Sequence, residues 1–221
     1  WQPMGAEHDA YLMVDAIGTE GGGGGLNCTL RDLARFGELM RNGGRVGEQQ
    51  VIPAAAVAEV AAGGSPEAFA NGGYTLLKGW SYRDMWWVTH NAHGAYMGRG
   101  IHGQSLYIDP KAEVVIARFG GHPVASSVGN DPLSLPGFHA MAQALMAREI
   151  SALMPSRDGA PCQRFGQALG CALATESSGG AGILAEQGVR VGAMQPQPRR
   201  MRDVTLSDPS GAVWRIAQST A

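Results

Sequence analysis

Residues 104–119 read QSLYIDPKAEVVIARF, two apolar runs on either side of a proline turn. Both runs are rich in β-branched and aromatic side chains, which favour strands. Pro110 and Lys111 between them are typical of the tight connection in an antiparallel hairpin. Residues 79–91, rich in Trp and Tyr, indicate further strands just before it. The sequence therefore predicts an antiparallel sheet that contains this hairpin.

Helical patterns flank the strands. Thr29 is a suitable N-cap, and the carboxylate of Asp32 can reach free N–H groups of the first turn. Apolar residues at helical spacing follow Asp32. We expect a second helix over residues 53–61 and a third over residues 136–149, which follows a polar loop at 120–135. This order predicts the α+β class, with helices packed on an antiparallel sheet.

Composition limits the classes of partner. The 221 residues are 44% apolar, enough for a buried core, and their net charge is −2. This balance argues against nucleic-acid and anionic-membrane partners, and the longest apolar stretch, residues 51–62, is shorter than the roughly 20 residues that span a bilayer. The three cysteines, Cys28, Cys162 and Cys171, form no C-x-x-C pair, so we expect a reduced, cytoplasmic setting without disulfides.

The character of the sequence changes after residue 149. Residues 1–149 carry ten basic and fourteen acidic groups, whereas residues 150–221 carry seven and five. Residues 150–180 are rich in Ser, Gly and Ala and have weak periodicity, which is typical of a linker or junction. We therefore expect a main domain at 1–149 and a separate small α/β unit at 181–221.

Several motifs in residues 1–149 resemble those of the β-lactamase-like serine hydrolases, a superfamily that includes DD-peptidases, esterases and amidases. The glycine run at 21–26, TLRDLARFG at 29–37 and GQSLYIDP at 103–110 carry this resemblance. Three further motifs are most similar to the 6-aminohexanoate-dimer hydrolase branch, which cleaves nylon oligomers: WWVTHN at 86–91, GIHGQ at 100–104 and FGGHP at 119–123. The resemblance implies the fold of that superfamily, here incomplete.

The chemistry of these hydrolases implies parts that can be sought one by one. A serine in S-x-x-K is the nucleophile, a tyrosine in Y-x-N moves its proton, and two backbone N–H groups form the oxyanion hole. Neither S-x-x-K nor Y-x-N occurs here, and TLLK at 75–78 has only the spacing, at the wrong place in the order of motifs. We expect both motifs upstream of Trp1, in an N-terminal half that this chain lacks.

A third motif of the family, usually K/H-T-G on a sheet-edge strand, corresponds to Gly98, Arg99 and Gly100. The resemblance then implies that the backbone N–H of Ile101 belongs to the oxyanion hole and that the triplet binds substrate. Gly98 cannot supply the usual positive charge, which disfavours a β-lactam carboxylate and favours an amide or ester. The alternative is a glycine-bent edge strand with no site.

Other substrate-binding candidates are two tryptophans and a histidine. Trp86 and Trp87 point to opposite faces of a strand, so we expect one in the core and the other on the pocket wall; core packing of both is the alternative. His102 is expected to line the pocket. No carboxylate or cysteine beside His90, His93 and His102 completes a ligand set, so we expect neither a metal nor another cofactor.

The tail has a different relative. Residues 181–221 resemble about half of a glyoxalase/bleomycin-resistance (vicinal oxygen chelate) domain, through GILAEQGV and DPSGAVW. We expect a helix over 181–189 and strands over 202–206 and 213–217. Arg215 stands where metal-dependent members commonly carry a glutamate, so the resemblance implies no metal there. A strand-turn-strand appendix outside any family is the alternative.

Together these patterns predict the C-terminal part of a serine hydrolase that acts on short linear amides or esters through an acyl-enzyme. Its substrates would be small molecules such as aminohexanoate oligomers. The isolated chain is expected to be inactive, to need the N-terminal half as its partner, and to self-associate through uncovered faces. The alternative is a non-catalytic binding module, or an inactive fusion fragment of a hydrolase and a glyoxalase-like domain.

Overall fold

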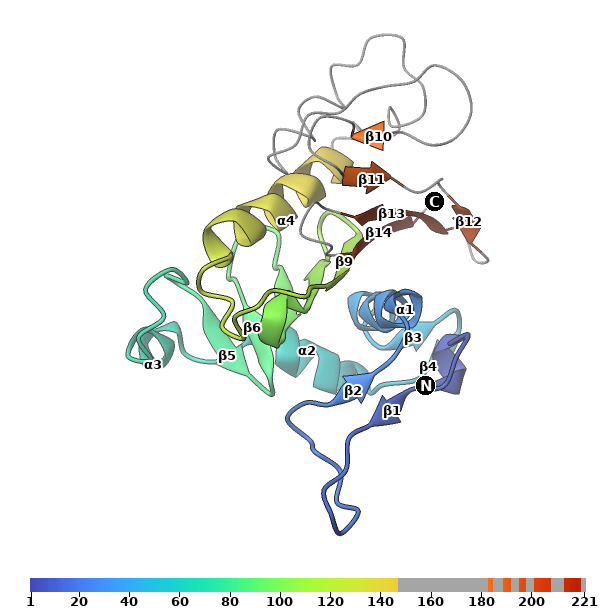
Figure 1. Cartoon of the computed structure of the whole chain (residues 1–221), viewed down its shortest axis with the longest axis horizontal. Coiled ribbons are helices and arrows are strands. Elements are labelled where there is room, and N and C mark those ends of the chain that lie inside the picture. The colour runs from blue at the N-terminus through green and yellow to red at the C-terminus, as the bar shows by residue number, and fades with distance from the viewer. Residues whose placement is uncertain (147–182, 185–188, 192–194, 198–200, 208–212, 220–221) are drawn as a thin grey trace.

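The computed structural model describes residues 1–146, 183–184, 189–191, 195–197, 201–207 and 213–219 (Figure 1). The helices in this part of the chain are α1 (Leu30–Arg41), α2 (Ala54–Ala62), α3 (Pro66–Ala70) and α4 (Asp131–Met146). The strands of the main sheet are β5 (Ser81–Arg83), β6 (Trp86–Val88), β7 (Tyr96–Arg99), β8 (Ser105–Asp109), β9 (Val114–Phe119), β10 (Ile183–Leu184), β11 (Val189–Val191), β12 (Gln195–Gln197), β13 (Met201–Ser207) and β14 (Val213–Ser219). Two small antiparallel pairs are β1 (Tyr11–Leu12) with β2 (Leu26–Asn27) and β3 (Arg45–Val46) with β4 (Gln49–Gln50).

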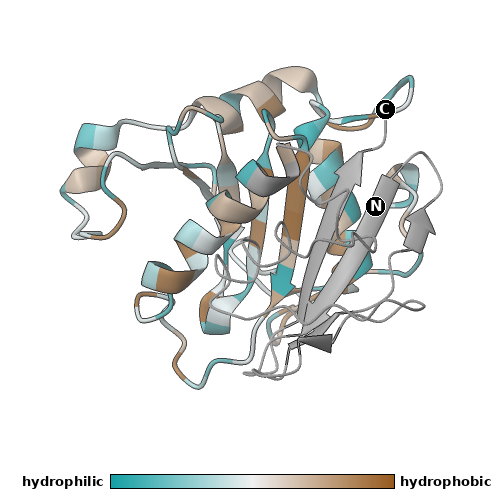
Figure 2. Cartoon of the chain, turned by 90° about the horizontal axis from the view of Figure 1, so that it is seen from above, coloured by the Kyte–Doolittle hydropathy of each residue, from teal (hydrophilic) through white to brown (hydrophobic). Residues whose placement is uncertain are grey.

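The main sheet is antiparallel, in the order β10-β11-β13-β14-β9-β8-β7-β6-β5, with β12 beside β13. The predicted hairpin is confirmed as β8 and β9, in which Tyr107 pairs with Ile116. Figure 2 shows hydrophobic residues along the strands at the centre of the sheet. The predicted combination of helices with an antiparallel sheet is therefore confirmed.

Helices cover both faces of the sheet because side chains alternate along each strand. Leu106 and Ile108 of β8 belong to the same buried cluster as Ala34 of α1. Tyr107, which lies between them in the chain, instead stacks on Phe138 of α4 with ring centroids 5.5 Å apart. α1 and α4 therefore lie on opposite faces of the sheet (Figure 1).

The predicted start of α1 is confirmed, since the Thr29 side chain accepts a hydrogen bond from the Asp32 amide at 3.1 Å. α1 lies unusually close to the sheet at Gly37. A Cβ added there would lie 2.5 Å from Cγ1 of Val115 and 2.9 Å from Cδ1 of Leu106. Only glycine lets the helix approach β8 and β9 this closely. The helix predicted over residues 53–61 is α2.

α4 begins at Asp131, inside the predicted polar loop, rather than at Pro136. Pro132 falls in the first turn, where a missing N–H breaks no helical hydrogen bond. The amide of Ser134 donates to the Asn130 carbonyl at 2.8 Å, which marks the helix start. Residues 147–149 of the predicted helix lie outside the described residues. Among the residues that the structure describes, no helix is both long enough and apolar enough to span a membrane.

The tail contributes strands to the main sheet. The strands predicted over 202–206 and 213–217 are confirmed as β13 and β14. β14 pairs with β9 along six residues, with Ile216 opposite Ile116, so the tail and the predicted hairpin share one sheet. The helix predicted over 181–189 is wrong, because Ile183–Leu184 and Val189–Val191 form β10 and β11. β10 pairs with β11, which pairs in turn with β13, so sheet pairing overrides the local helical pattern there.

Two segments for which the sequence makes predictions lie outside the described residues. They are the linker at 150–180 and residues 208–211, the start of the DPSGAVW motif. The division of the chain at 149/150 and the glyoxalase-like identity of 181–221 stay predictions.

Candidate active site

A glycine-rich turn connects β7 to β8 and holds the predicted oxyanion-hole residue. Gly98 and Arg99 end β7, and Gly100 leads into a single 3-10 turn, Ile101–Gly103. The Gly100 amide donates to the Gln104 carbonyl at 2.9 Å, which closes the turn. A Cβ on Gly100 would lie 2.9 Å from Cβ of Gln104, so this position requires glycine. At Gly98 a Cβ would meet only Cβ of Leu106, at 3.9 Å.

The backbone N–H of Ile101 is not used inside the turn. Its neighbours are occupied, since Gly100 donates to Gln104 and His102 donates to the Ala125 carbonyl at 2.9 Å. Ile101 is the first residue of the 3-10 turn, so its amide has no partner within the turn, and no backbone hydrogen bond from it is found in the other turns and loops of the described residues. The Ile101 side chain is 64% exposed. A fixed, unengaged N–H beside an exposed strand end is the donor that an oxyanion hole needs.

Gln104 and His102 fix the turn to the segment after β9. The Gln104 amide group donates to the Gly120 carbonyl at 2.7 Å and accepts from the Gly120 amide at 3.0 Å. Nδ1 of His102 lies 2.7 Å from the His122 carbonyl. A Cβ on Gly120 would lie 2.6 Å from the His102 carbonyl, so this approach also needs glycine. The GIHGQ and FGGHP motifs are therefore two sides of one contact, which holds the Ile101 amide in place.

Arg99 is engaged within the protein. Nη2 of its guanidinium donates to both carboxylate oxygens of Asp131, at 2.5 and 2.7 Å. The guanidinium also lies 4.6 Å from the ring centroid of Trp87, a cation–π arrangement. Its side chain is only 10% exposed. The guanidinium of Arg99, a predicted substrate-binding residue, therefore contacts Asp131 of α4 and the ring of Trp87.

Trp86 and Trp87 lie on opposite faces of β6, as their adjacent positions predict. Trp86 packs toward α1 and the core, with ring centroids 6.3 Å from Phe36 and 5.4 Å from Tyr96. Trp87 meets three further rings edge-on at 5.1 to 5.7 Å: Phe69, Tyr74 and Tyr82. Tyr74 and Tyr82 are each 46% exposed, so this aromatic cluster reaches the surface.

Sequence reasoning missed the partners of Trp87. Tyr82 lies opposite it on the neighbouring strand, a pairing that the Trp- and Tyr-rich composition of residues 79–91 could have suggested. Phe69 and Tyr74 come from α3 and the loop that follows it, and Phe69 stacks on Tyr74 at 5.0 Å. No pattern in the sequence links those two residues to β6.

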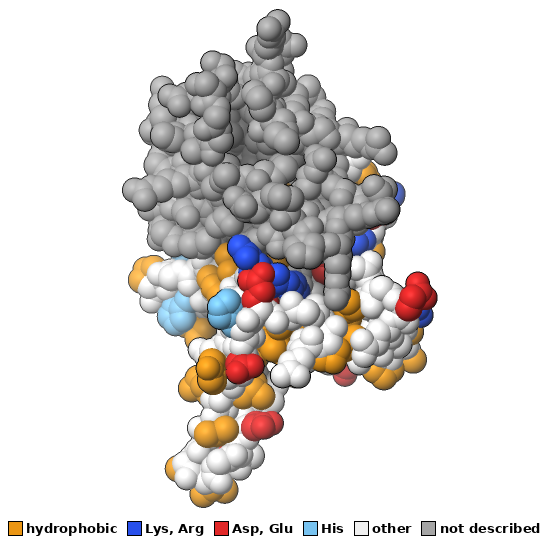
Figure 3. Space-filling model, turned by 90° about the vertical axis from the view of Figure 1, so that its right-hand side faces the viewer, with side chains coloured by type: hydrophobic (Ala, Val, Ile, Leu, Met, Phe, Trp, Pro, Cys, Tyr) orange, Lys and Arg blue, Asp and Glu red, His pale blue; other side chains and the backbone are white. Residues whose placement is uncertain are grey.

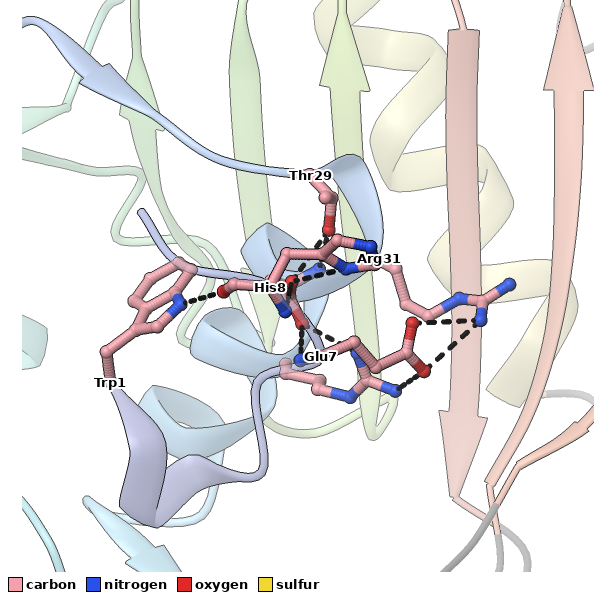
Figure 4. Close-up of polar contacts among 7 residues, drawn as sticks. Trp1, Glu7, His8, Thr29 and Arg31 are labelled. Carbon is pink, nitrogen blue, oxygen red and sulfur yellow. Dashed lines mark hydrogen bonds and ion pairs between the residues drawn. The ribbon is translucent and has the colours of Figure 1, made fainter. Parts of the chain in front are cut away.

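The TLRDLARFG motif at 29–37 has a structural role in this chain (Figure 4). The buried Asp32 carboxylate accepts hydrogen bonds from the Glu7 amide at 2.9 Å, from the Thr29 hydroxyl at 2.8 Å and from Arg35 at 2.6 Å. Burial by itself raises the pKa of Asp32, but these hydrogen bonds outweigh it and hold the pKa below its ordinary value. The motif therefore attaches the first residues of the chain to α1.

The three histidines considered as metal ligands, His90, His93 and His102, do not lie together. Nε2 of His90 lies 2.7 Å from the Ser81 hydroxyl, and His102 contacts the loop after β9. His93 lies instead beside Asp109 and His139, a carboxylate and a histidine that its local sequence does not contain. The expectation that no carboxylate completes a ligand set with these histidines is therefore wrong for His93.

Comparisons with known proteins agree with part of the sequence analysis. No protein-family profile matches the chain. The chain is 40% identical over 124 residues, 56% of its length, to a 6-aminohexanoate-dimer hydrolase of Paenarthrobacter ureafaciens, of which it covers 32%. A solved structure of a provisionally assigned 6-aminohexanoate-dimer hydrolase from Bacillus anthracis is 31% identical, with a TM-score of 0.48, over 69% of this chain and 37% of that one. The chain thus spans about a third of the length of the curated relative, and over that part it is similar to a hydrolase.

Proposed function

We propose that this chain forms the oxyanion-hole side of a serine hydrolase that cleaves short linear amides or esters, in the manner of 6-aminohexanoate-dimer hydrolases. The observation that carries the proposal is the unengaged Ile101 N–H, held in a fixed turn within a segment similar to such a hydrolase. Trp87 pairs with Met97 of β7, the strand that leads to Ile101, so Trp87 and its exposed aromatic neighbours supply one wall of the proposed substrate site.

In this proposal the nucleophilic serine and its lysine come from polypeptide upstream of Trp1. The serine oxygen attacks the substrate carbonyl, whose oxygen becomes negatively charged, and the Ile101 N–H donates a hydrogen bond to that oxygen. The amine or alcohol then leaves with a proton, and water hydrolyses the acyl-enzyme. Removal of one such donor typically lowers kcat by about 10²- to 10³-fold.

The surroundings of the turn favour an uncharged, methylene-rich part of a linear substrate beside the scissile bond. Gly98 offers no cation, and the guanidinium of Arg99 is bound by Asp131. An aromatic surface formed by Tyr74, Tyr82 and Trp87 suits the methylene groups of an aminohexanoate unit, because these contacts bury apolar area without charge.

The test uses the reading frame extended to the coding sequence upstream of Trp1. The expected frame contains S-x-x-K followed by Y-x-N, and its product hydrolyses 6-aminohexanoate dimer and is labelled by a fluorescent phosphonate. Ile101→Pro removes the N–H at the first position of the 3-10 turn, which proline tolerates. The preceding Gly100 is already extended, with φ −109° and ψ 172°, as a residue before proline must be.

Ile101→Ala is the matched control, because it shortens the side chain and keeps the N–H. We expect Ile101→Pro to lower kcat by about 100-fold or more and Ile101→Ala to leave it within a few-fold. Equal activity of the two variants contradicts the oxyanion role. An upstream reading frame that lacks S-x-x-K contradicts the proposed hydrolase function.

A binding module is the second candidate function. It is favoured by the exposed aromatic cluster around Trp87 together with the absence of S-x-x-K from the sequence. In that case the chain alone binds 6-aminohexanoate dimer with a change in tryptophan fluorescence and releases it unchanged. Trp87→Leu removes the binding, whereas Ile101→Pro leaves it intact.

A further inference from the structure

We propose that His93, Asp109 and His139 bind a divalent transition-metal ion of the zinc class. The three side chains come from the connection between β6 and β7, from the end of β8 and from α4. One potential ligand atom of each lies within 4.8 Å of those of the other two. This inference does not depend on the proposed hydrolase function.

Asp109 and His93 already form the core of the site. Oδ2 of Asp109 lies 2.8 Å from Nδ1 of His93, and the Asp109 residue is wholly buried. The other carboxylate oxygen accepts from the Ala112 amide at 2.9 Å, which fixes the carboxylate plane. Tyr107 adds a hydroxyl 3.3 Å from Oδ2. Such outer hydrogen bonds orient a metal-binding carboxylate.

His139 supplies the unpaired group that points to a ligand. Its ring centroid lies 4.8 Å from that of His93, and its Nδ1 is buried with no hydrogen-bond partner among the described residues. A buried nitrogen of this kind costs free energy unless something binds it. Imidazole nitrogens are the commonest protein ligands of metal ions of this class.

Two imidazoles and one carboxylate form a ligand set typical of zinc, which leaves a fourth position for water. Tetrahedral ligands at zinc distances lie about 3.4 Å apart. Binding would therefore need the ligand atoms, now up to 4.8 Å apart, to move closer together. His139 itself is only half-buried.

The site lies away from the proposed oxyanion hole. Tyr96 pairs with Ile108, whereas Arg99 pairs with Ser105, so His93 and Asp109 are at one end of the β7–β8 hairpin and Ile101 is at the other. An ion here would join α4 to two segments of the sheet. We infer a stabilising role for it rather than a part in the hydrolysis.

The experiment uses the full chain, with any affinity tag removed and metals stripped by a chelator. Zn²⁺ is titrated by calorimetry, Co²⁺ by its visible absorption, and Tm is measured with and without Zn²⁺. We expect one ion per chain and a raised Tm. His139→Gln and His93→Gln should lower the affinity at least about tenfold and remove the Tm shift.

His8→Gln is the matched control, because it deletes an exposed histidine far from the site in the chain and should bind as the unchanged chain does. His139→Gln changes a half-buried helix position, and circular dichroism of the metal-free form verifies that it folds. Absence of stoichiometric binding by the unchanged chain overturns the proposal. So does unchanged affinity in both His139→Gln and His93→Gln, since the ion would then be bound elsewhere.

Discussion

Arg99 and Asp131, 32 residues apart in the chain, form an ion pair in which one guanidinium nitrogen donates to both carboxylate oxygens. Asp131 is the first residue of α4, and Arg99 is the last residue of β7, two positions before Ile101. Both side chains are almost fully buried. The pair thus connects the N-terminus of α4 to the strand that leads into the proposed oxyanion hole.

Asp131→Asn should be strongly destabilising. It leaves the Arg99 guanidinium buried without its counter-charge, which typically costs about 3–5 kcal/mol of unfolding free energy. Glu59→Gln is the control, because Glu59 pairs with Arg83 at an exposed site, where such pairs contribute about 0–1 kcal/mol. Urea denaturation of both variants measures the difference. Equal losses would mean that burial adds nothing to the Arg99–Asp131 pair.

Gly37→Ala should destabilise the chain even though alanine favours helices by about 1 kcal/mol. The added Cβ would overlap Cγ1 of Val115 at 2.5 Å, and overpacking of this kind costs about 1–3 kcal/mol. Gly22→Ala is the control, since a Cβ there meets no atom within 4 Å. Thermal denaturation compares the two variants. A Gly37→Ala chain as stable as the unchanged protein would show that α1 does not lie this close to β9.

Stability should fall in acid because of Asp32. The folded pKa of this carboxyl is held below its ordinary value of 3.8, so folding favours the ionised form. The stabilisation is complete above pH 3.8 and is lost as the pH falls through the lower folded value. Asp32→Asn should be less stable near neutral pH and should show a flatter pH dependence below 3.8. Unfolding free energies against pH test this, with Asp9→Asn, an exposed carboxylate of the same segment, as the control.

The adjacent tryptophans should separate stability from ligand binding. Trp86→Ala removes a ring that packs with Phe36 and Tyr96, so it should cost about 3–5 kcal/mol. Trp87→Ala should cost less and should weaken the binding of 6-aminohexanoate dimer, because Trp87 lies in the surface aromatic cluster. Urea titration and ligand fluorescence distinguish the two effects. A larger loss of stability from Trp87→Ala than from Trp86→Ala would contradict the prediction, because it would mean that Trp87 is the ring packed in the core.

The ribbon formed by β1, β2 and the loop between them (residues 11–27) should promote self-association. It projects from the body of the molecule, and hydrophobic side chains are spread over it (Figure 3). Tyr11, Met13 and Ile17 are 69, 65 and 88% exposed. Met13→Lys together with Ile17→Lys should shift sedimentation toward a monomer. Asp15→Lys, which adds a cation to the same ribbon without removing apolar surface, is the control, and an equal shift would point to charge alone.

Local patterns predicted the parts of the fold that are decided locally. The β8–β9 hairpin and the start of α1 each have their signals within a few residues, at Pro110 and Thr29. The start of α4 at Asp131 was missed because Ser, Gly, Asn and Pro around it are typical of loops. The sequence of residues 181–189 predicts a helix. The strand β10 forms there instead because its pairing with β11 in the sheet outweighs that local pattern.

The candidate site was predicted unevenly for a related reason. The oxyanion-hole role of Ile101 rests on family motifs that lie close together in the chain, and it stays a prediction. The engagement of Arg99 by Asp131 could not be predicted, because it depends on where a distant helix begins. His93 and His139 are likewise separated by 46 positions and meet only when α4 packs on the sheet.

The pairing of β14 with β9 decides which strand is the border of the sheet. With β8 on one side and β14 on the other, β9 is an interior strand whose apolar residues have no open backbone groups to offer. A chain cut before β14 would expose that row of donors and acceptors to other molecules, a template for strand-to-strand aggregation. β14 therefore covers the backbone edge of β9, a strand with five buried residues.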